Sequence, residues 1–176
     1  MMNQNTQQYF PGDLREISVC FTGHRFIPTI DIPKIRSLLT LTIMDLYNKG
    51  YRHFYCGGAL GFDTLAAEAV LALRKEHSDV VLHIAVPCVT QSDLWSETDQ
   101  KRYRLILDKA DYVHIMSEFY YRGCMEIRNR FMVDHSSLCV CWLLRFNRSG
   151  TMSTVKYAAR QDIPVINLAL LSGKEK

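Results

Sequence analysis

The sequence predicts an α/β fold: a single Rossmann-like domain with a mainly parallel sheet of about six strands and helices on both faces. Three observations support this fold class. Short apolar, β-branched or aromatic runs recur along the chain, and segments with helical periodicity separate them. This alternation is typical of right-handed βαβ crossovers. The runs are also almost continuously apolar, as expected for strands that are buried on both faces.

The expected strands are short and rich in β-branched or aromatic residues, which is typical of a buried sheet. They are Ile17–Phe21, Arg52–Cys56, Val80–Val86, Tyr112–Met116, Leu138–Leu144 and Ile163–Leu168.

Five segments between the strands are expected to be helices. In the first, Asp31 stands at the N-cap position, Pro33 in the first turn and Gly50 at the end. Its apolar stripe contains Ile35, Leu38, Leu39, Ile43 and Leu46, and that of the second helix contains Leu65, Ala66, Ala69, Val70 and Leu73. The remaining helices are expected at about Glu97–Lys109, Gly123–His135 and Thr151–Gln161.

The composition indicates one cytoplasmic domain with no membrane span. The chain has 176 residues, 48% of them apolar, and a net charge of +3, which excludes disorder over most of its length. We assign residues 14–170 to the domain, and residues 1–13 and 171–176 to flexible tails. No apolar run reaches the roughly 18 residues of a membrane span, and the N-terminus has no signal-peptide pattern.

The cysteines and the glycine motifs give no indication of a metal or a cofactor. The six cysteines lie mostly in apolar runs, as reduced thiols do. Cys139-Val140-Cys141 lacks the spacing and the second ligand pair of a zinc site. The sequence also lacks a GxGxxG fingerprint and a P-loop.

Glycine-rich segments follow the first two strands, at the sheet edge where ligands bind in parallel sheets. Thr22-Gly23-His24-Arg25 either brings backbone N–H groups and positive charge to a phosphate, or is an ordinary turn. Gly57, Gly58 and Gly61 allow a sharp turn and a close approach to a ligand. Asp63 either caps the next helix, which we favour slightly, or accepts a hydrogen bond from a ribose hydroxyl.

Arg128 is the strongest single candidate for a charge that faces a ligand. It lies on the stripe of its predicted helix that faces the sheet, where an arginine is costly unless it is paired. The alternative is a structural ion pair, for which Glu126, Asp134 and Asp63 are the candidates. Ser149-Gly150-Thr151 opens the last helix and suits a second anion site. Together, these loops predict a ligand that carries a phosphate, such as a nucleotide.

The sequence resembles the YpsA-like branch of the SLOG superfamily over about Ser18 to Asn167. This Rossmann-like group includes DprA and the LOG proteins. The resemblance rests on several motifs in order: Phe21-Thr22-Gly23-His24-Arg25, Gly57–Asp63 leading into Ala66-Ala67-Glu68, Gln91 with Trp95, Tyr120, Arg128-Asn129, Met132-Val133-Asp134, Gly150-Thr151 and Tyr157-Ala158. It implies a nucleotide or nucleotide-derived ligand at the C-terminal ends of the strands. LOG proteins are phosphoribohydrolases, whereas DprA handles single-stranded DNA.

The comparison with LOG proteins bears on catalysis. Their site pairs an arginine early in a helix with a PGGxGTxxE loop, whose glutamate is catalytic. By this resemblance, Arg128 takes the place of the arginine and Gly150-Thr151 that of the GT. Thr154 stands at the glutamate position, and Asn147-Arg148-Ser149 replaces the Pro-Gly-Gly. The resemblance therefore implies a non-catalytic sensor or regulator rather than a hydrolase. The carboxylates that would have to substitute in a hydrolase are Glu68, Glu126 and Asp63.

The expected ligand-binding residues come from four segments of the chain: Thr22, Gly23, His24, Arg25, Gly57, Gly58, Gly61, Asp63, Arg128, Asn129, Gly150 and Thr151. We expect a nucleotide-type small molecule as the partner and assign no catalytic residue. The first alternative is a nucleotide phosphoribohydrolase, or N-glycosidase.

The second alternative is the binding of single-stranded nucleic acid. Basic residues cluster in the sequence near three aromatic ones, a mixture that can follow a phosphate backbone and stack bases. They are Arg122, Arg128, Arg130, Arg145, Arg148, Lys156 and Arg160, with Phe119, Tyr120 and Tyr121. The small net charge makes nucleic acid the less favoured partner. Apolar helix faces and Tyr120-Tyr121 are also compatible with a homo-oligomer.

Overall fold

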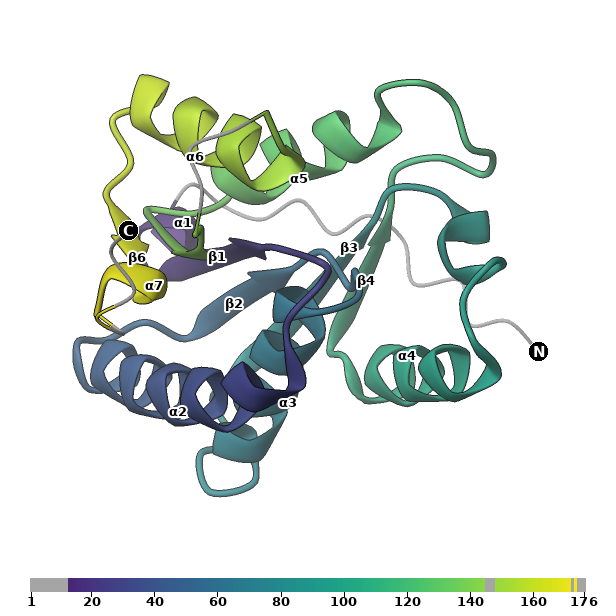
Figure 1. The fold of residues 1–176 in the computed structure, drawn as a ribbon. Helices are drawn as coiled ribbons and strands as arrows, with labels where there is room; N and C mark the ends of the chain where they lie inside the picture. The colour runs from purple at the N-terminus through teal and green to yellow at the C-terminus, as the bar shows by residue number, and fades with distance from the viewer. Residues whose placement is uncertain (1–12, 145–147, 172, 174–176) are drawn as a thin grey trace.

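A computed structural model describes residues 13–144, 148–171 and 173. Six parallel strands form one sheet in the order β4-β3-β2-β1-β5-β6 (Figure 1). They are β1 (Ser18–Gly23), β2 (His53–Cys56), β3 (Val81–Val86), β4 (Tyr112–Ile115), β5 (Leu138–Trp142) and β6 (Val165–Asn167). The fold class expected from the sequence is therefore confirmed.

Helices cover both faces of the sheet, as the right-handed connections require (Figure 1). One face carries α2 (Ile32–Asn48), α3 (Phe62–Arg74) and α4 (Glu97–Lys109), and the other carries α5 (Cys124–Asp134) and α6 (Gly150–Arg160). Two short helices, α1 (Asp13–Glu16) and α7 (Leu168–Leu171), lie near the chain ends. The 3-10 turns η1 (Thr29–Asp31) and η2 (Val89–Ser92) follow β1 and β3.

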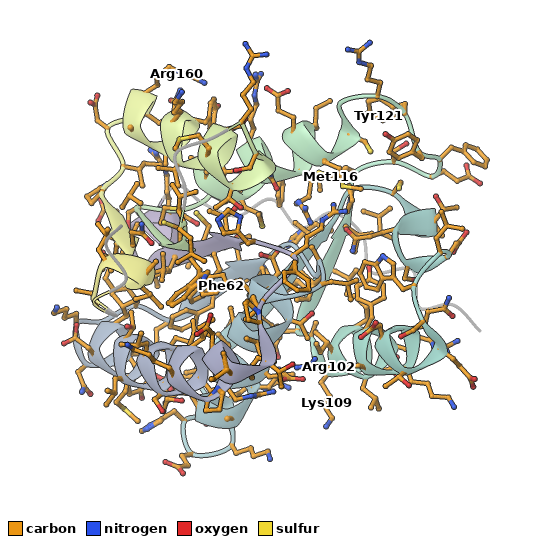
Figure 2. The ribbon with its side chains drawn as sticks, viewed as in Figure 1. Phe62, Arg102, Lys109, Met116, Tyr121 and Arg160 are labelled. Atoms are coloured by element: carbon orange, nitrogen blue, oxygen red, sulfur yellow. The ribbon has the colours of Figure 1, made fainter. Side chains whose placement is uncertain are left out.

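The core has two layers because alternate side chains of each strand point to opposite faces. On the α2–α3 side, Phe21, Phe54 and Phe62 are fully buried, and Figure 2 shows Phe62 in the middle of the molecule. On the α5–α6 side, Cys20 and Cys139 lie opposite each other on β1 and β5. All six cysteines are free and buried, which agrees with the expectation of reduced thiols.

The helix boundaries lie close to those expected from the sequence. In α2, Asp31 is the N-cap residue, a proline occupies the first turn, and Gly50 adopts a φ of 98° just beyond the C-cap. The edge strand β4 departs from two-sided burial, since Val113 and Ile115 are exposed. Within the described residues, no helix is long and apolar enough to cross a membrane. The same part of the chain shows no group of three or more side chains that could hold a metal ion.

Candidate functional site

The order of the strands reverses between β1 and β5, and this is the point at which open α/β sheets bind ligands. His24, which follows β1, connects the loops there. Its Nε2 accepts a hydrogen bond from the backbone N–H of Leu144 at 3.2 Å, and its carbonyl accepts one from the N–H of Phe62 at 3.2 Å. The segments that follow β1 and β5 therefore meet the start of α3 at one edge of the sheet.

Gly57 packs against the side chains of two other candidate residues. A Cβ atom at this position would lie 2.6 Å from Cζ of Arg128 and 2.6 Å from Oδ2 of Asp63. Real Cβ atoms essentially never come this close to other atoms. A side chain at position 57 would therefore displace Arg128 or Asp63, and glycine lets both pack closely against the turn.

The other glycines of this edge also allow close packing within the protein. Gly58 and Gly61 have φ values of 62° and 78°, which are unfavourable for other residues. A Cβ atom on Gly61 would overlap the carbonyl group of Arg25, and one on Gly23 would overlap the ring of Phe62. The glycine-rich segment is therefore first of all a tightly packed junction between loops.

Asp63 does not cap α3, so the role that we favoured for it is wrong. The N-cap residue is Gly61, and Asp63 is the second residue of the helix. The carboxylate of Asp63 accepts hydrogen bonds from the backbone N–H groups of Ala59 and Gly57, which holds the glycine turn in place. Asp63 is only 5% exposed, and burial raises its pKa to about 6 despite the opposing effect of Arg128.

Arg128 belongs to α5 and is 4% exposed. Its Nη1 donates hydrogen bonds to the carbonyls of Gly57 and, at 3.3 Å, Ala85, and its Nε donates to Oδ1 of Asn129 at 2.7 Å. Burial lowers the pKa of Arg128, while the nearby charge of Asp63 raises it. Of the three carboxylates considered from the sequence, Asp63 is the one that compensates this buried charge. Arg128 thereby ties α5 to the ends of β2 and β3.

A cavity of about 380 Å³ lies between α5 and α6, and we call it the α5–α6 cavity. Helix α5 packs against β1 and β3, and α6 packs against β1 and β5. Every described residue that lines the cavity belongs to these two helices or is Gly123, the N-cap of α5. Of the predicted residues, Asn129 and Gly150 line it. The full lining is Gly123, Met125, Glu126, Asn129, Arg130, Gly150, Ser153, Thr154, Lys156, Tyr157 and Arg160.

The first turns of α5 and α6 form one end of this cavity, which we call the near end. Gly123 caps α5 in the left-handed conformation. Ser149 caps α6, and its Oγ accepts a hydrogen bond from the N–H of Met152 at 3.1 Å. The N–H groups and the positive dipole ends of the two helices favour an anion at this end. Thr151 is buried in the first turn of α6.

Basic side chains line the rest of the cavity, which we call the far end. They are Arg130, Lys156 and Arg160. The one acidic side chain among the described lining residues, Glu126, belongs to the first turn of α5, at the near end. Glu126 accepts a hydrogen bond from Arg130 at 2.5 Å. Arg130 and Arg160 also lie 5.3 and 5.8 Å from the ring centre of Tyr157. The cavity therefore has an excess of positive charge.

The carboxylates considered as catalytic substitutes lie in three different surroundings. Glu68 lies on α3, where it pairs with Arg102 at 2.5 Å and Arg36 at 2.9 Å. Asp63 is buried under the glycine turn, whereas Glu126 lines the cavity. At the position of the LOG glutamate, the hydroxyl of Thr154 donates to the carbonyl of Gly150 at 2.8 Å.

Gln91 and Trp95, part of the family motif, support the glycine loop. The Nε2 of Gln91 donates to the carbonyl of Gly58 at 3.4 Å and to the hydroxyl of Tyr103 at 3.2 Å. The ring of Trp95 packs edge-on against Tyr103 at 5.2 Å. These residues therefore hold the loop after β2 against α4.

The sequence analysis did not place Met125, Ser153 and Tyr157 in the site, although they line the cavity. It connected Arg130, Lys156 and Arg160 with nucleic acid alone. The spacing of Ser153, Tyr157 and Arg160, three or four residues apart, marks one face of a helix and was the available signal. Arg145 and Asn147, which the sequence analysis also considered, lie outside the described residues.

Comparison with known proteins identifies the family. The YpsA family model, described as the YspA SLOG family, matches residues 28–163. The chain is 31% identical over 123 residues to a UPF0398 protein of Halalkalibacterium halodurans, a match that covers 69% of this chain and 62% of that protein. This chain thus spans less than two thirds of that relative. It is also 29% identical over 140 residues to the SPbeta prophage-derived protein YoqJ of Bacillus subtilis, covering 72% and 81% of the two chains.

A solved structure shares the fold. DNA processing protein A of Helicobacter pylori, described by its single-stranded DNA binding mode, matches with a TM-score of 0.60 and 18% identity. The match covers 94% of this chain and 78% of that one. Since the family model spans more than half of the sequence, this chain belongs to the YspA SLOG family.

Proposed function

We propose that this protein binds a nucleotide or nucleotide-derived ligand in the α5–α6 cavity, with a phosphate at the near end, and that it acts as a sensor or regulator. The observation that carries the proposal is one cavity in which two helix N-termini and three basic side chains come together. Its volume of about 380 Å³ lies in the range of small-molecule sites. Its place beside the strand reversal is also the usual one for ligands in this fold class.

The predicted residues outside the cavity have a supporting role in this proposal. Arg128 donates to Asn129, which lines the cavity, and to the carbonyls of Gly57 and Ala85 at the strand ends. It therefore fixes the position of α5 relative to the sheet. Asp63 compensates the charge of Arg128 and holds the glycine turn. In this way, the buried pair positions one wall of the site without touching the ligand.

The cavity favours binding over hydrolysis because its lining, among the described residues, offers no unpaired carboxylate. A phosphoribohydrolase needs a carboxylate beside the glycosidic carbon. Thr154 supplies none, and the cavity carboxylate, Glu126, is paired with Arg130. We therefore expect an adenine nucleotide to be recovered intact after incubation with the protein. If free base is released, Glu126→Gln tests whether this carboxylate is the acid.

Gly150 offers a sharp test of the phosphate position. A Cβ atom there has open space around it, and an aspartate in the first turn of a helix is favourable for folding. Gly150→Asp should thus keep its fold but repel a phosphate, whereas Gly150→Asn adds a side chain of the same size without the charge.

The measurement is thermal stability with and without AMP. At about 100 times its Kd, a ligand adds about 2.7 kcal/mol, which raises the Tm of a domain of this size by roughly 5–11 °C. We expect the rise in the parent and in Gly150→Asn, and its loss in Gly150→Asp. Equal rises in all three proteins would contradict a phosphate at the near end.

Single-stranded nucleic acid is the second candidate, favoured by one observation. Phe119 and Tyr120 are 68% and 66% exposed on the loop before α5, where they are free to stack on bases. The matched DprA protein is described as binding single-stranded DNA. A salt-dependent gel shift of an oligonucleotide, lost in Phe119→Ala/Tyr120→Ala, is the expected result for this alternative.

A further inference from the structure

The α5–α6 cavity has two separate positive regions. At the near end, Gly123 and Gly150 mark the N-termini of α5 and α6, where positive potential comes from backbone N–H groups. At the far end, it comes from Arg130, Lys156 and Arg160. Uncharged polar side chains, including Ser153 and Thr154, lie along the walls between the two regions.

The two regions lie too far apart for one phosphate. From Gly150 to Arg160, helix α6 rises by about 15 Å, at 1.5 Å per residue. Figure 2 shows Arg160 at the end of the helical layer that lies away from the loop carrying Tyr121. A phosphate held by the first turn of α6 leaves the charges of the far end unneutralised.

The groups around the far end leave its positive charge largely available. Glu126 pairs with Arg130 at 2.5 Å and compensates one of the three basic side chains. Asp134 accepts a hydrogen bond from the hydroxyl of Tyr157 at 2.8 Å and is not part of the cavity lining. Lys156 and Arg160 are exposed and lie on the α6 wall.

We infer that the cavity selects a nucleotide-derived ligand in which a nucleoside separates two phosphate groups, so that the phosphates reach both ends of the cavity, over a nucleoside monophosphate. This inference rests on the proposed function, because it concerns the same site. The chemistry that the lining recognises is a phosphodiester-linked chain, because the two phosphates of a pyrophosphate share one oxygen atom and cannot reach both ends. Lys156 and Arg160 determine the preference, whereas the helix N-termini bind the phosphate that all such ligands share.

The test compares the affinities of three probes by calorimetry: AMP, ADP and the dinucleotide pApA. We expect pApA to bind at least 10-fold more tightly than either AMP or ADP. Lys156→Ala/Arg160→Ala should remove that gain, so that the three probes bind the variant with similar affinities. A gain for ADP alone would overturn the inference, because its two phosphates share an oxygen atom and cannot reach both ends.

A matched control is available on the opposite face of the sheet. Lys101→Ala/Arg104→Ala on α4 removes the same charge from exposed positions and should change none of the three affinities. Equal affinities for AMP, ADP and pApA, or a double variant on α6 that behaves like the parent, would overturn the inference while leaving the proposed function intact. If none of the probes binds, the proposed function fails as well.

Discussion

Arg128 and Asp63 are buried side chains of opposite charge that both pack against Gly57 at the strand ends. Their charges compensate each other, and each side chain also binds the main chain of the glycine turn, Arg128 through a carbonyl and Asp63 through N–H groups. The pair therefore defines the geometry of the site more than it contributes to binding.

At the same scale, Gly57 provides a direct test of the packing. Gly57→Ala forces a Cβ atom against Arg128 and Asp63, and overpacking of this kind costs about 1–3 kcal/mol. Gly150→Ala is the matched control, because its Cβ has open space and alanine favours a helix. Urea unfolding should show a loss of stability for the first variant alone. Equal stability of the two would mean that the junction is looser than described.

Asp63 should make stability depend on pH. The folded carboxyl has a pKa of about 6, above its ordinary value of 3.8, so the folded state binds more protons between these values. As the pH rises from about 4 to about 6, Asp63 therefore lowers the free energy of unfolding, by up to ~3 kcal/mol.

Asp63→Asn isolates this effect, because the amide does not titrate. We expect the difference in unfolding free energy between this variant and the parent to change across that pH interval and to stay constant above it. A difference that is independent of pH would show that Asp63 is ionised throughout.

At the scale of elements, a row of histidines joins three neighbouring strands. Nδ1 of His53 lies 2.9 Å from Nε2 of His83, and Nδ1 of His83 lies 3.0 Å from Nε2 of His114. Burial lowers the pKa of all three, to about 2 for His83 and about 4 for His114. Helix α5 covers the row through Phe131, which lies 5.1 Å from His114.

These histidines should destabilise the fold in acid. Their ordinary pKa is 6.5, so the unfolded state takes up protons first as the pH falls. The stability that they contribute is fully present above about pH 6.5 and is lost as the pH falls, down to about 4 for His114 and about 2 for His83, the opposite sign to Asp63. Between pH 6.5 and 4.5, the free energy of unfolding should fall less in His83→Gln than in the parent. The same pH dependence in both proteins would contradict a neutral row.

Periodicity predicted the elements because each strand and helix is determined largely by its own residues. The helix Glu97–Lys109 was predicted with its observed ends. In the structure, Oγ of Ser96 caps this helix by accepting a hydrogen bond from the N–H of Asp99. The burial of Arg128 followed from its place on the apolar stripe. Asp63 was one of three carboxylates considered as the partner of Arg128. The contact of Arg128 with the carbonyl of Gly57 could not be predicted, because these residues lie 71 positions apart and meet only in the packed structure.

At the scale of the whole molecule, the order of the strands determines where the cavity can form. The chain adds β2, β3 and β4 on one side of β1, and β5 and β6 on the other side. Helices α5 and α6 therefore lie side by side on one face, with their N-termini at the carboxyl ends of the strands (Figure 1). The sequence analysis expected the site at this edge, with residues from four segments of the chain. The α5–α6 cavity includes Asn129 and Gly150 of those residues.

The most direct test of this account is an amide chemical-shift titration of the protein with AMP. We expect the largest shifts at the backbone N–H groups of the first turns of α5 and α6, near Gly123 and Gly150, and small ones on α2 and α4. Shifts centred on another surface, or none at saturating AMP, would contradict the assignment of the α5–α6 cavity as a nucleotide site.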